Sequence, residues 1–126
     1  MKKRVFNTNK SPATKAPYSQ AVIFDNMIFI SGQVAINPKT KKMVKGGIEK
    51  EVEQALSNLK AILEEMGSSL SKVLKVSVFL TDIRQFDKVN TVYKKFFPFD
   101  PPARCCMGVS ALPFGANVEI EAQAHL

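Results

Sequence analysis

Apolar and polar positions follow one another along the chain with two different periods, and each period indicates a different kind of element. Between residues 48 and 66, apolar side chains recur every three or four positions, and acidic and basic side chains lie between them. This spacing places the apolar side chains on one face of a helix. Gly67 follows at once, at a position where glycine commonly ends a helix. We therefore expect a long helix that packs its single apolar face across a sheet.

Shorter apolar segments that are rich in β-branched and aromatic residues predict strands. Residues 22–24 and 27–30 flank Asp25 and Asn26, which both tolerate positive φ, so the two segments predict a tight hairpin. Three further strands are expected over residues 73–80, 103–109 and 118–124.

A second amphipathic helix is expected over residues 83–97, where Pro98 ends the periodic pattern. Its apolar stripe consists of Phe86, Val89, Tyr93 and Phe96. The order of elements is then strand, strand, helix, strand, helix, strand, strand. Two amphipathic helices that return to strands predict crossover connections on one face of a mixed sheet. We expect an α+β fold in one domain, residues 1–126, with a second sheet face that is solvated or buried by a partner chain.

The composition is typical of a globular protein, with 126 residues of which 45% are apolar and 23% are charged. The basic start, Met1-Lys2-Lys3-Arg4, is not followed by an apolar segment, and no segment is long enough to span a bilayer, so we expect neither export nor membrane insertion. A disulfide between the adjacent Cys105 and Cys106 would be strained, which favours a reducing, cytoplasmic location. With His125 as the single histidine, the chain lacks the ligands for a zinc site.

The net charge of +7 leaves two interpretations open. Basic clusters attract nucleic acid or acidic metabolites, but scattered lysines also simply keep a surface solvated. Aromatic side chains are not interleaved with the lysines, as a stacking platform for single strands would require. The clusters are Lys2, Lys3, Arg4, Lys10 and Lys15, and then Lys39, Lys41, Lys42 and Lys45.

Candidate chemistry lies in the last two predicted strands, because phosphate-binding loops, nucleotide-binding glycine patterns and nucleophile elbows are all missing from the sequence. Strand alternation places Arg104 and Cys106 on one face, together with Gly108. The other face, formed by Ala103, Cys105, Met107 and Val109, is apolar, and we expect Cys105 to point into the subunit. Glu119 and Glu121 lie opposite the core-facing side of their strand. If the two strands pair, arginine and glutamate share a face, and alternation alone favours an ordinary cross-strand ion pair.

Four other residues, in three segments, are weaker candidates by themselves. Ser31 and Gly32 end a predicted strand, where a glycine lets a ligand approach the backbone or simply makes a turn. Tyr18 precedes a strand, where it can present a phenol to a pocket or pack at the edge. Asn90 falls off the apolar stripe of the second helix, and exposure to solvent is its default interpretation.

Taken together, seven segments resemble the Rid family of reactive-intermediate deaminases, in order and from about residue 16 to residue 124. They are Ala16-Pro17-Tyr18-Ser19-Gln20-Ala21-Val22, Ile30-Ser31-Gly32-Gln33, Glu65-Met66-Gly67-Ser68-Ser69-Leu70, Val78-Phe79-Leu80-Thr81-Asp82, Val89-Asn90-Thr91-Val92-Tyr93, Pro102-Ala103-Arg104-Cys105-Cys106 and residues 112–122. Cys105 departs from many relatives, which carry serine, alanine or threonine there.

The resemblance implies a chorismate-mutase-like α+β fold, a homotrimer with active sites between subunits, and hydrolysis of small enamines and imines such as 2-iminobutanoate and 2-iminopropanoate to 2-keto acids and ammonia. It implies no cofactor and no metal. Carried over by motif, the expected catalytic residues are Arg104, Glu119 and Cys106, and the expected substrate-binding residues are Tyr18, Ser31, Gly32, Asn90 and Arg104. Cys106 would act through its backbone carbonyl. Some relatives of this kind have been described as translation inhibitors or ribonucleases, and a non-catalytic metabolite-binding role is a third alternative.

Overall fold

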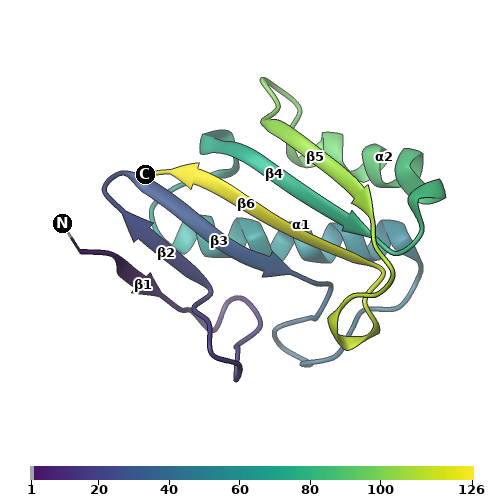
Figure 1. Ribbon diagram of the computed structural model, residues 1–126, viewed down its shortest axis with the longest axis horizontal. Helices are drawn as coiled ribbons and strands as arrows, with labels where there is room; N and C mark the ends of the chain where they lie inside the picture. Colours follow the sequence, from purple (N-terminus) through teal and green to yellow (C-terminus); the bar gives the residue numbers. More distant parts are fainter. Residues whose placement is uncertain (1) are drawn as a thin grey trace.

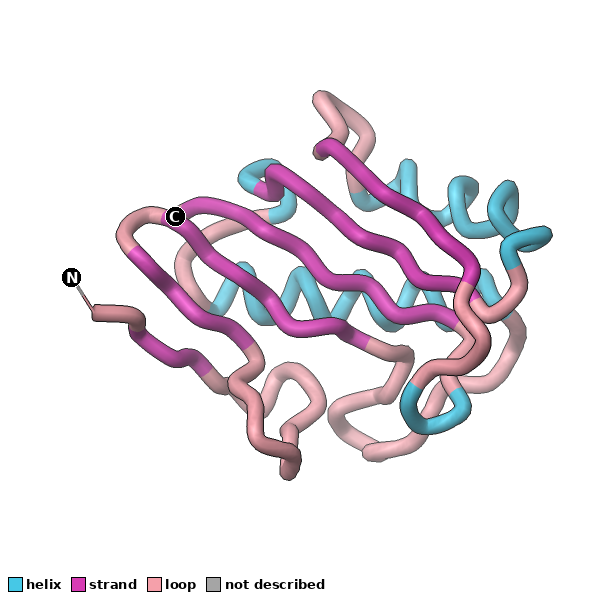
Figure 2. Tube along the Cα trace, in the orientation of Figure 1, coloured by secondary structure: helices cyan, strands magenta, loops and turns pink. Residues whose placement is uncertain are grey.

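The computed structural model describes residues 2–126 as a twisted sheet with helices on one of its faces (Figure 1; Figure 2). The sheet has six strands in these residues. They are β1 (Arg4–Phe6), β2 (Ala21–Phe24), β3 (Met27–Gln33), β4 (Val73–Leu80), β5 (Ala103–Gly108) and β6 (Val118–His125). Two α-helices, α1 (Ile48–Glu65) and α2 (Phe86–Phe96), cover the sheet.

The spatial order of the strands is β1-β2-β3-β6-β4-β5. All neighbouring pairs are antiparallel except β4 and β5, which are parallel. A parallel pair needs a crossover connection, and α2 supplies it. The last strand, β6, therefore lies in the middle of the sheet between β3 and β4, and β5 lies at an edge.

The core lies between α1 and the central strands, as the helical period predicts. The apolar stripe of α1 is fully buried at Val52, Leu56, Leu59 and Leu63. It packs on alternate residues of the strands, among them Ile28, Val76, Val78 and Ile120. At the end of α1, Gly67 has a φ of 81°, so glycine provides the left-handed residue that ends the helix.

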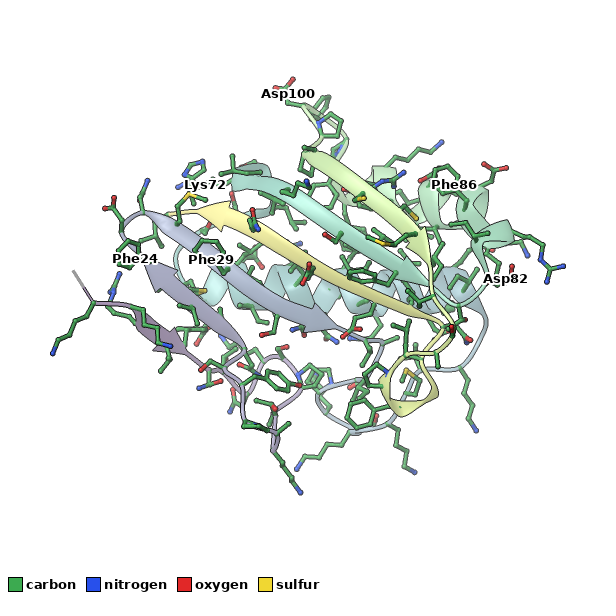
Figure 3. The ribbon with its side chains drawn as sticks, viewed as in Figure 1. Phe24, Phe29, Lys72, Asp82, Phe86 and Asp100 are labelled. Carbon is green, nitrogen blue, oxygen red and sulfur yellow. The ribbon has the colours of Figure 1, made fainter. Side chains whose placement is uncertain are left out.

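The other face of the sheet, which we call the open face, is not covered by any element within residues 2–126 (Figure 1). One row of side chains crosses all six strands on this face: Val5, Val22, Phe29, Gln123, Lys75 and Ala103. Figure 3 shows Phe29 standing on the strands rather than under the helices. Large apolar side chains are exposed here, with Val5 at 60%, Phe29 at 43% and Met107 at 42%.

Three features differ from the sequence prediction. The strand β1 has no counterpart among the predicted elements, because only three residues pair with β2. The second helix is preceded by a 3-10 turn, Ile83–Gln85, where the Asp82 side chain accepts a hydrogen bond from the Arg84 amide. The expectation that Cys105 points into the subunit is wrong, because Cys105 is exposed.

Candidate functional site

Arg104 faces the helices. Its neighbour across the parallel pair is Val76, which is fully buried beneath the helices, and paired residues of adjacent strands point to the same side. The guanidinium Nη1 donates a hydrogen bond of 2.8 Å to the Oδ1 of Asn90. Its carbon lies 4.7 Å from the ring centre of Tyr93 and 5.4 Å from that of Phe86. The second helix therefore holds the arginine by an amide and two aromatic rings.

The charge of Arg104 is not neutralised by any carboxylate in the part of the chain that the structure describes. The residue is half-buried, and within residues 2–126 no carboxylate forms an ion pair with it. The cross-strand ion pair favoured by alternation is therefore wrong. A half-buried cation that is fixed in place but has no anion beside it is a suitable receptor for an anionic ligand.

Asn90 is also placed differently from its default interpretation. It is half-buried rather than exposed, because the Phe86 and Tyr93 face of α2 includes it and points at Arg104. Residues three or four positions apart lie on the same side of a helix. The spacing of Phe86, Asn90 and Tyr93 therefore already indicated that the three side chains share one face.

Cys106 lies on the same side of β5 as Arg104, two residues further along, and packs against the core. The pKa of its thiol is raised, mainly by burial. The charge of Arg104 opposes this rise, and Cys105 adds to it. A thiol whose pKa is raised stays protonated near neutral pH and is a poor nucleophile. Cys105 lies on the open face instead, beside Ser77 of the neighbouring strand.

Tyr93 is buried next to the guanidinium. Burial raises the pKa of its phenol to about 12, against a smaller lowering by Arg104. The hydroxyl has no hydrogen-bond partner among the described residues, although it is shielded from solvent. Sequence reasoning placed this residue in the apolar stripe and missed its contact with Arg104.

Glu119 faces away from the helices. Its neighbours Val118 and Ile120 are fully buried in the core, so alternation turns Glu119 towards the open face, where Phe79 of β4 is its cross-strand neighbour. Burial raises the pKa of this half-buried carboxyl, and the like charge of Glu121 raises it further.

Ser31 and Gly32 form a bulge in β3. The register with β6 moves from Ile30 opposite Ala122 to Gln33 opposite Ile120, so the two residues between them share one partner position. The bulge brings Gly32 against Glu119, and a Cβ built on Gly32 would lie 2.8 Å from the carboxyl carbon of Glu119. Only glycine leaves room for the carboxylate in this position.

Tyr18 is exposed and lies one residue from Ser19, whose carbonyl accepts a hydrogen bond of 2.6 Å from the Ser31 hydroxyl. The segment around it is held from below by Gln20, which is buried and donates to the carbonyl of Pro12 at 2.7 Å. Tyr18, Ser31, Gly32 and Glu119 thus belong to one neighbourhood at the end of β3.

Two buried glutamines anchor this neighbourhood, and sequence reasoning assigned them no role. Besides Gln20, the Oε1 of Gln33 accepts from the hydroxyl of Ser11, while its Nε2 donates to the Ser31 carbonyl at 3.0 Å. Buried amides need such partners, so these glutamines tie the N-terminal segment to the bulge. The available signal was a glutamine directly before β2 and another at the last position of β3.

A shallow depression of about 240 Å³ lies beside this neighbourhood on the open face. It is lined by both apolar and ionisable side chains. These are Val22, Phe29, Ile30, Ser31, Lys75, Ser77, Glu121, Ala122 and Gln123. The depression is therefore a feature of the face on which Glu119 lies and not of the face on which Arg104 lies.

One chain therefore brings the predicted site residues into two groups and not one. Asn90, Arg104 and Cys106 form the first group, beneath α2 at the edge of the sheet. The second group is Tyr18, Ser31, Gly32 and Glu119, at the end of β3. The pairing of the last two strands that would have joined them does not occur, because β4 lies between β5 and β6.

The described residues offer neither a metal-binding cluster nor a membrane-spanning helix. Residues 2–126 contain no cluster of three or more histidine, cysteine, aspartate or glutamate side chains that could hold a metal ion. None of the helices in this range is both long enough and apolar enough to cross a membrane.

The fold and these residues agree with a family of small α+β proteins, described as Endoribonuclease L-PSP, which matches the chain over residues 8–126. The chain belongs to this family, the Rid family. A 2-iminobutanoate/2-iminopropanoate deaminase of Homo sapiens is 44% identical over 122 residues, covering 97% of this chain and 89% of the human protein. A RutC family protein of Pyrococcus abyssi is 45% identical over 125 residues, covering 99% of this chain and 98% of that protein.

The structural comparison agrees with the sequence comparison. The crystal structure of E. coli TdcF with bound serine is 34% identical, has a TM-score of 0.92, and covers 98% of each chain. The expected chorismate-mutase-like α+β fold, a mixed sheet with two helices on one face, is confirmed.

Proposed function

We propose that the protein is a 2-iminobutanoate/2-iminopropanoate deaminase, which hydrolyses small imino acids to 2-keto acids and ammonia. The observation that carries the proposal is the half-buried guanidinium of Arg104, which is fixed by Asn90 and has no carboxylate partner within residues 2–126. Relatives that bear this enzyme name match nearly the full length of the chain.

Arg104 is assigned to the substrate carboxylate. Its planar fork pairs with both carboxylate oxygens, and this contact fixes the adjacent imine carbon. The TdcF relative was crystallised with serine, an amino acid with an α-carboxylate of the same kind. Asn90 takes one guanidinium hydrogen and so limits the directions in which the others point.

Glu119 is assigned to the attacking water. The carboxylate accepts a proton from the water while the oxygen forms a bond to the imine carbon, and the nitrogen of the protonated imine takes the electron pair of the C=N bond. The raised pKa of Glu119 suits a group that takes up this proton and returns it to nitrogen. The C–N bond of the tetrahedral adduct then breaks with loss of ammonia, and the hydroxyl proton passes to the Glu119 carboxylate as the C=O of the keto acid forms.

Cys106 is assigned a role through its backbone carbonyl, as a second acceptor for the water. The raised pKa of its thiol argues against a thiolate nucleophile. Because β5 is an edge strand that pairs with β4 alone, backbone groups on its outer side have no strand partner. Tyr18, Ser31 and Gly32, which lie in the same group as Glu119, are assigned to contacts with the substrate.

The two groups of residues lead us to propose a homotrimer in which each active site lies between subunits. Arg104 and Glu119 lie on opposite sides of one sheet, so a second copy can bring its Glu119 to the Arg104 of the first. The open face carries exposed Val5, Phe29 and Met107, and burial against other copies would remove this apolar surface from water.

The activity is tested with a threonine dehydratase that generates the imine, by measuring the rate at which the keto acid appears. Added wild-type protein is expected to accelerate this release. Arg104→Ala is expected to lose the acceleration, whereas a variant as fast as wild type would show that the assigned role of Arg104 is wrong.

Subunit sharing is tested by mixing two inactive variants, Arg104→Ala and Glu119→Gln. If each site takes one residue from each of two copies, randomly mixed trimers regain about one quarter of the wild-type activity, because one site in four then has both native residues. If both residues act within one chain, mixing gives no recovery, and the shared site is ruled out.

An RNA-directed activity is the second candidate, since the net charge is +7 and the matching family is described as an endoribonuclease. Binding to RNA should then weaken steeply as salt is raised. RNA cleavage that survives Arg104→Ala and Glu119→Ala would count against a shared active site. Carboxylate binding without turnover would instead support a metabolite-binding module.

The cytoplasm is the proposed location. Cys105 and Cys106 are both free, in agreement with a reducing compartment. Oxidation of purified protein should therefore be unnecessary for full activity.

A further inference from the structure

Three residues of α2 form one receptor for the Arg104 side chain. Phe86, Asn90 and Tyr93 are spaced by four and three residues and so lie on one side of the helix. Phe86 and Tyr93 are about two turns, or ~10 Å, apart along the axis. The guanidinium carbon contacts both rings, at 5.4 Å and 4.7 Å, and therefore lies between them, with the Asn90 amide in the middle.

The chemistry of this receptor is unusual for a half-buried cation. A carboxylate would hold the guanidinium more strongly, but it would also neutralise the charge and occupy two donors. An aromatic face attracts a cation through its quadrupole and takes up none of the N–H groups. Among the described residues, the Oδ1 of Asn90 accepts one N–H hydrogen of the Arg104 guanidinium. The positive charge and the remaining N–H donors therefore stay available for a ligand.

The position of Tyr93 is consistent with a role beyond filling space. Its ring is buried and packs against the Phe97 ring, with 4.8 Å between the ring centres and an interplanar angle of 38°. Its hydroxyl has no partner among the described residues. The hydroxyl therefore contributes no hydrogen bond to holding the helix, and what the residue supplies to Arg104 is its ring face.

We propose that Tyr93 and Phe86 are positioning residues of the active site, which fix the plane of the Arg104 guanidinium so that its unused donors meet the substrate carboxylate. The proposal rests on the proposed function for the identity of the ligand. The two rings act through Arg104 and make no assigned contact with the reacting atoms. The carboxylate-binding unit thus consists of Arg104 and the three α2 residues that form its receptor.

The test compares Tyr93→Leu, which removes the ring and stays apolar, with Tyr93→Phe, which keeps the ring. The matched control is Phe97→Leu, which removes a buried ring of the same cluster that does not contact Arg104. Tyr93→Leu is expected to raise KM about tenfold and to change kcat by less than about twofold. Tyr93→Phe is expected to restore the wild-type KM, and Phe97→Leu to keep it.

A merely structural role gives a different pattern. Partial unfolding lowers the fraction of active protein, and with it kcat, but leaves KM unchanged. The same KM in Tyr93→Leu as in wild type, or an equal rise in Phe97→Leu, would overturn the proposal. Phe86→Leu provides a second variant at a position that is 38% exposed and therefore safer for folding. Its KM is expected to rise as well, and to a smaller extent, because its ring is further from the guanidinium.

A second measurement does not depend on catalysis. NMR of the side-chain nitrogen atoms measures how fast the Arg104 guanidinium rotates about its Nε–Cζ bond. We expect this rotation to be slow in wild type and fast in Tyr93→Leu. Equally fast rotation in both proteins would overturn the proposal. Calorimetric titration with 2-oxobutanoate, with its neutral amide as the control, measures carboxylate binding directly. If wild type binds neither 2-oxobutanoate nor its amide and does not accelerate imine hydrolysis, the proposed function is contradicted. Slow rotation of the guanidinium in wild type would still support the receptor for Arg104.

Discussion

The carboxylate of Glu119 occupies the space that a side chain at position 32 would need. Gly32 lies in the β3 bulge, and a Cβ built there would lie 2.8 Å from the Glu119 carboxyl carbon. The contact joins the bulge to the proposed base without a hydrogen bond. The absence of a side chain at one residue therefore determines where the carboxylate of another can lie.

Gly32→Ala should disable the base while leaving the fold intact. The added methyl group must displace the Glu119 carboxyl group, and a displacement of about 1 Å can lower kcat about 100-fold. Imine hydrolysis and thermal unfolding measure the two effects. Gly108→Ala is the control, because its added Cβ would meet Ile83 at an ordinary 3.4 Å. Full activity in Gly32→Ala would show that Glu119 does not need its present position.

Replacing Glu121 should change the pH dependence of the reaction. The proposed base, Glu119, can accept a proton only when it is ionised, so activity should fall as pH drops through its raised pKa. The negative charge of Glu121 contributes to that raised pKa, and Glu121→Gln removes it. The acid limb of the kcat/KM profile should then move to lower pH.

The charge-preserving variant Glu121→Asp serves as the control and should leave the acid limb near its wild-type position. Sedimentation of each variant reports whether the assembly has changed. An acid limb that stays in place in Glu121→Gln would mean that Glu119 is not the group that titrates in the reaction.

Asn58 should be among the most sensitive polar positions for stability. It is 1% exposed, and its Nδ2 donates to the carbonyls of Val34 at 3.1 Å and Ile36 at 2.9 Å. Asn58→Ala leaves these carbonyls without their partner and should lower the free energy of unfolding by about 2 kcal/mol. Denaturant unfolding measures this loss.

Gln54→Ala is a suitable comparison, because Gln54 is half-buried and donates a single hydrogen bond, to Asn58 itself. Its loss should be about 0.5 kcal/mol. Equal losses in both variants would show that water replaces Asn58 at the two carbonyls.

Local patterns were sufficient to predict most elements of this fold. The hairpin around Asp25, the long helix that ends at Gly67 and the strand over residues 73–80 all follow from period and turn chemistry, and each is confirmed. These features depend on residues that are close in sequence. The pairing partners of β5 and β6 do not, because the position of β6 inside the sheet follows from packing over the whole chain.

The faces of β5 show why the site was harder to predict. Alternation correctly separates Arg104 and Cys106 from Cys105 and Met107, but hydrophobicity predicts that the apolar set faces the interior. In the structure the apolar set lies on the open face, and Arg104 lies beneath α2. Hydrophobicity at a strand marks any surface that is to be buried, and it does not distinguish the core of one chain from an interface between chains.

Asn90 shows a similar limit. A polar residue beside an apolar stripe is most often solvated, and its role became visible only with its partner, which comes from a strand 14 positions later. The motif resemblance selected Asn90 and Arg104 together. It did not select Tyr93 or Phe86 as contacts of the arginine, since an aromatic residue on a helix is adequately explained by the core.

The parallel pairing of β4 and β5 has a consequence for how the protein can be altered. The crossover that this pairing requires is also the segment that holds Arg104, so changes in α2 affect both the stability of the sheet edge and the position of the Arg104 guanidinium. The segment before β2 has no such double duty, because Tyr18 is exposed and held through neighbouring backbone groups. Redesign for larger or smaller substrates therefore has its greatest freedom at residues 16–19, whereas the carboxylate contact proposed for Arg104 is tied to the α2 crossover.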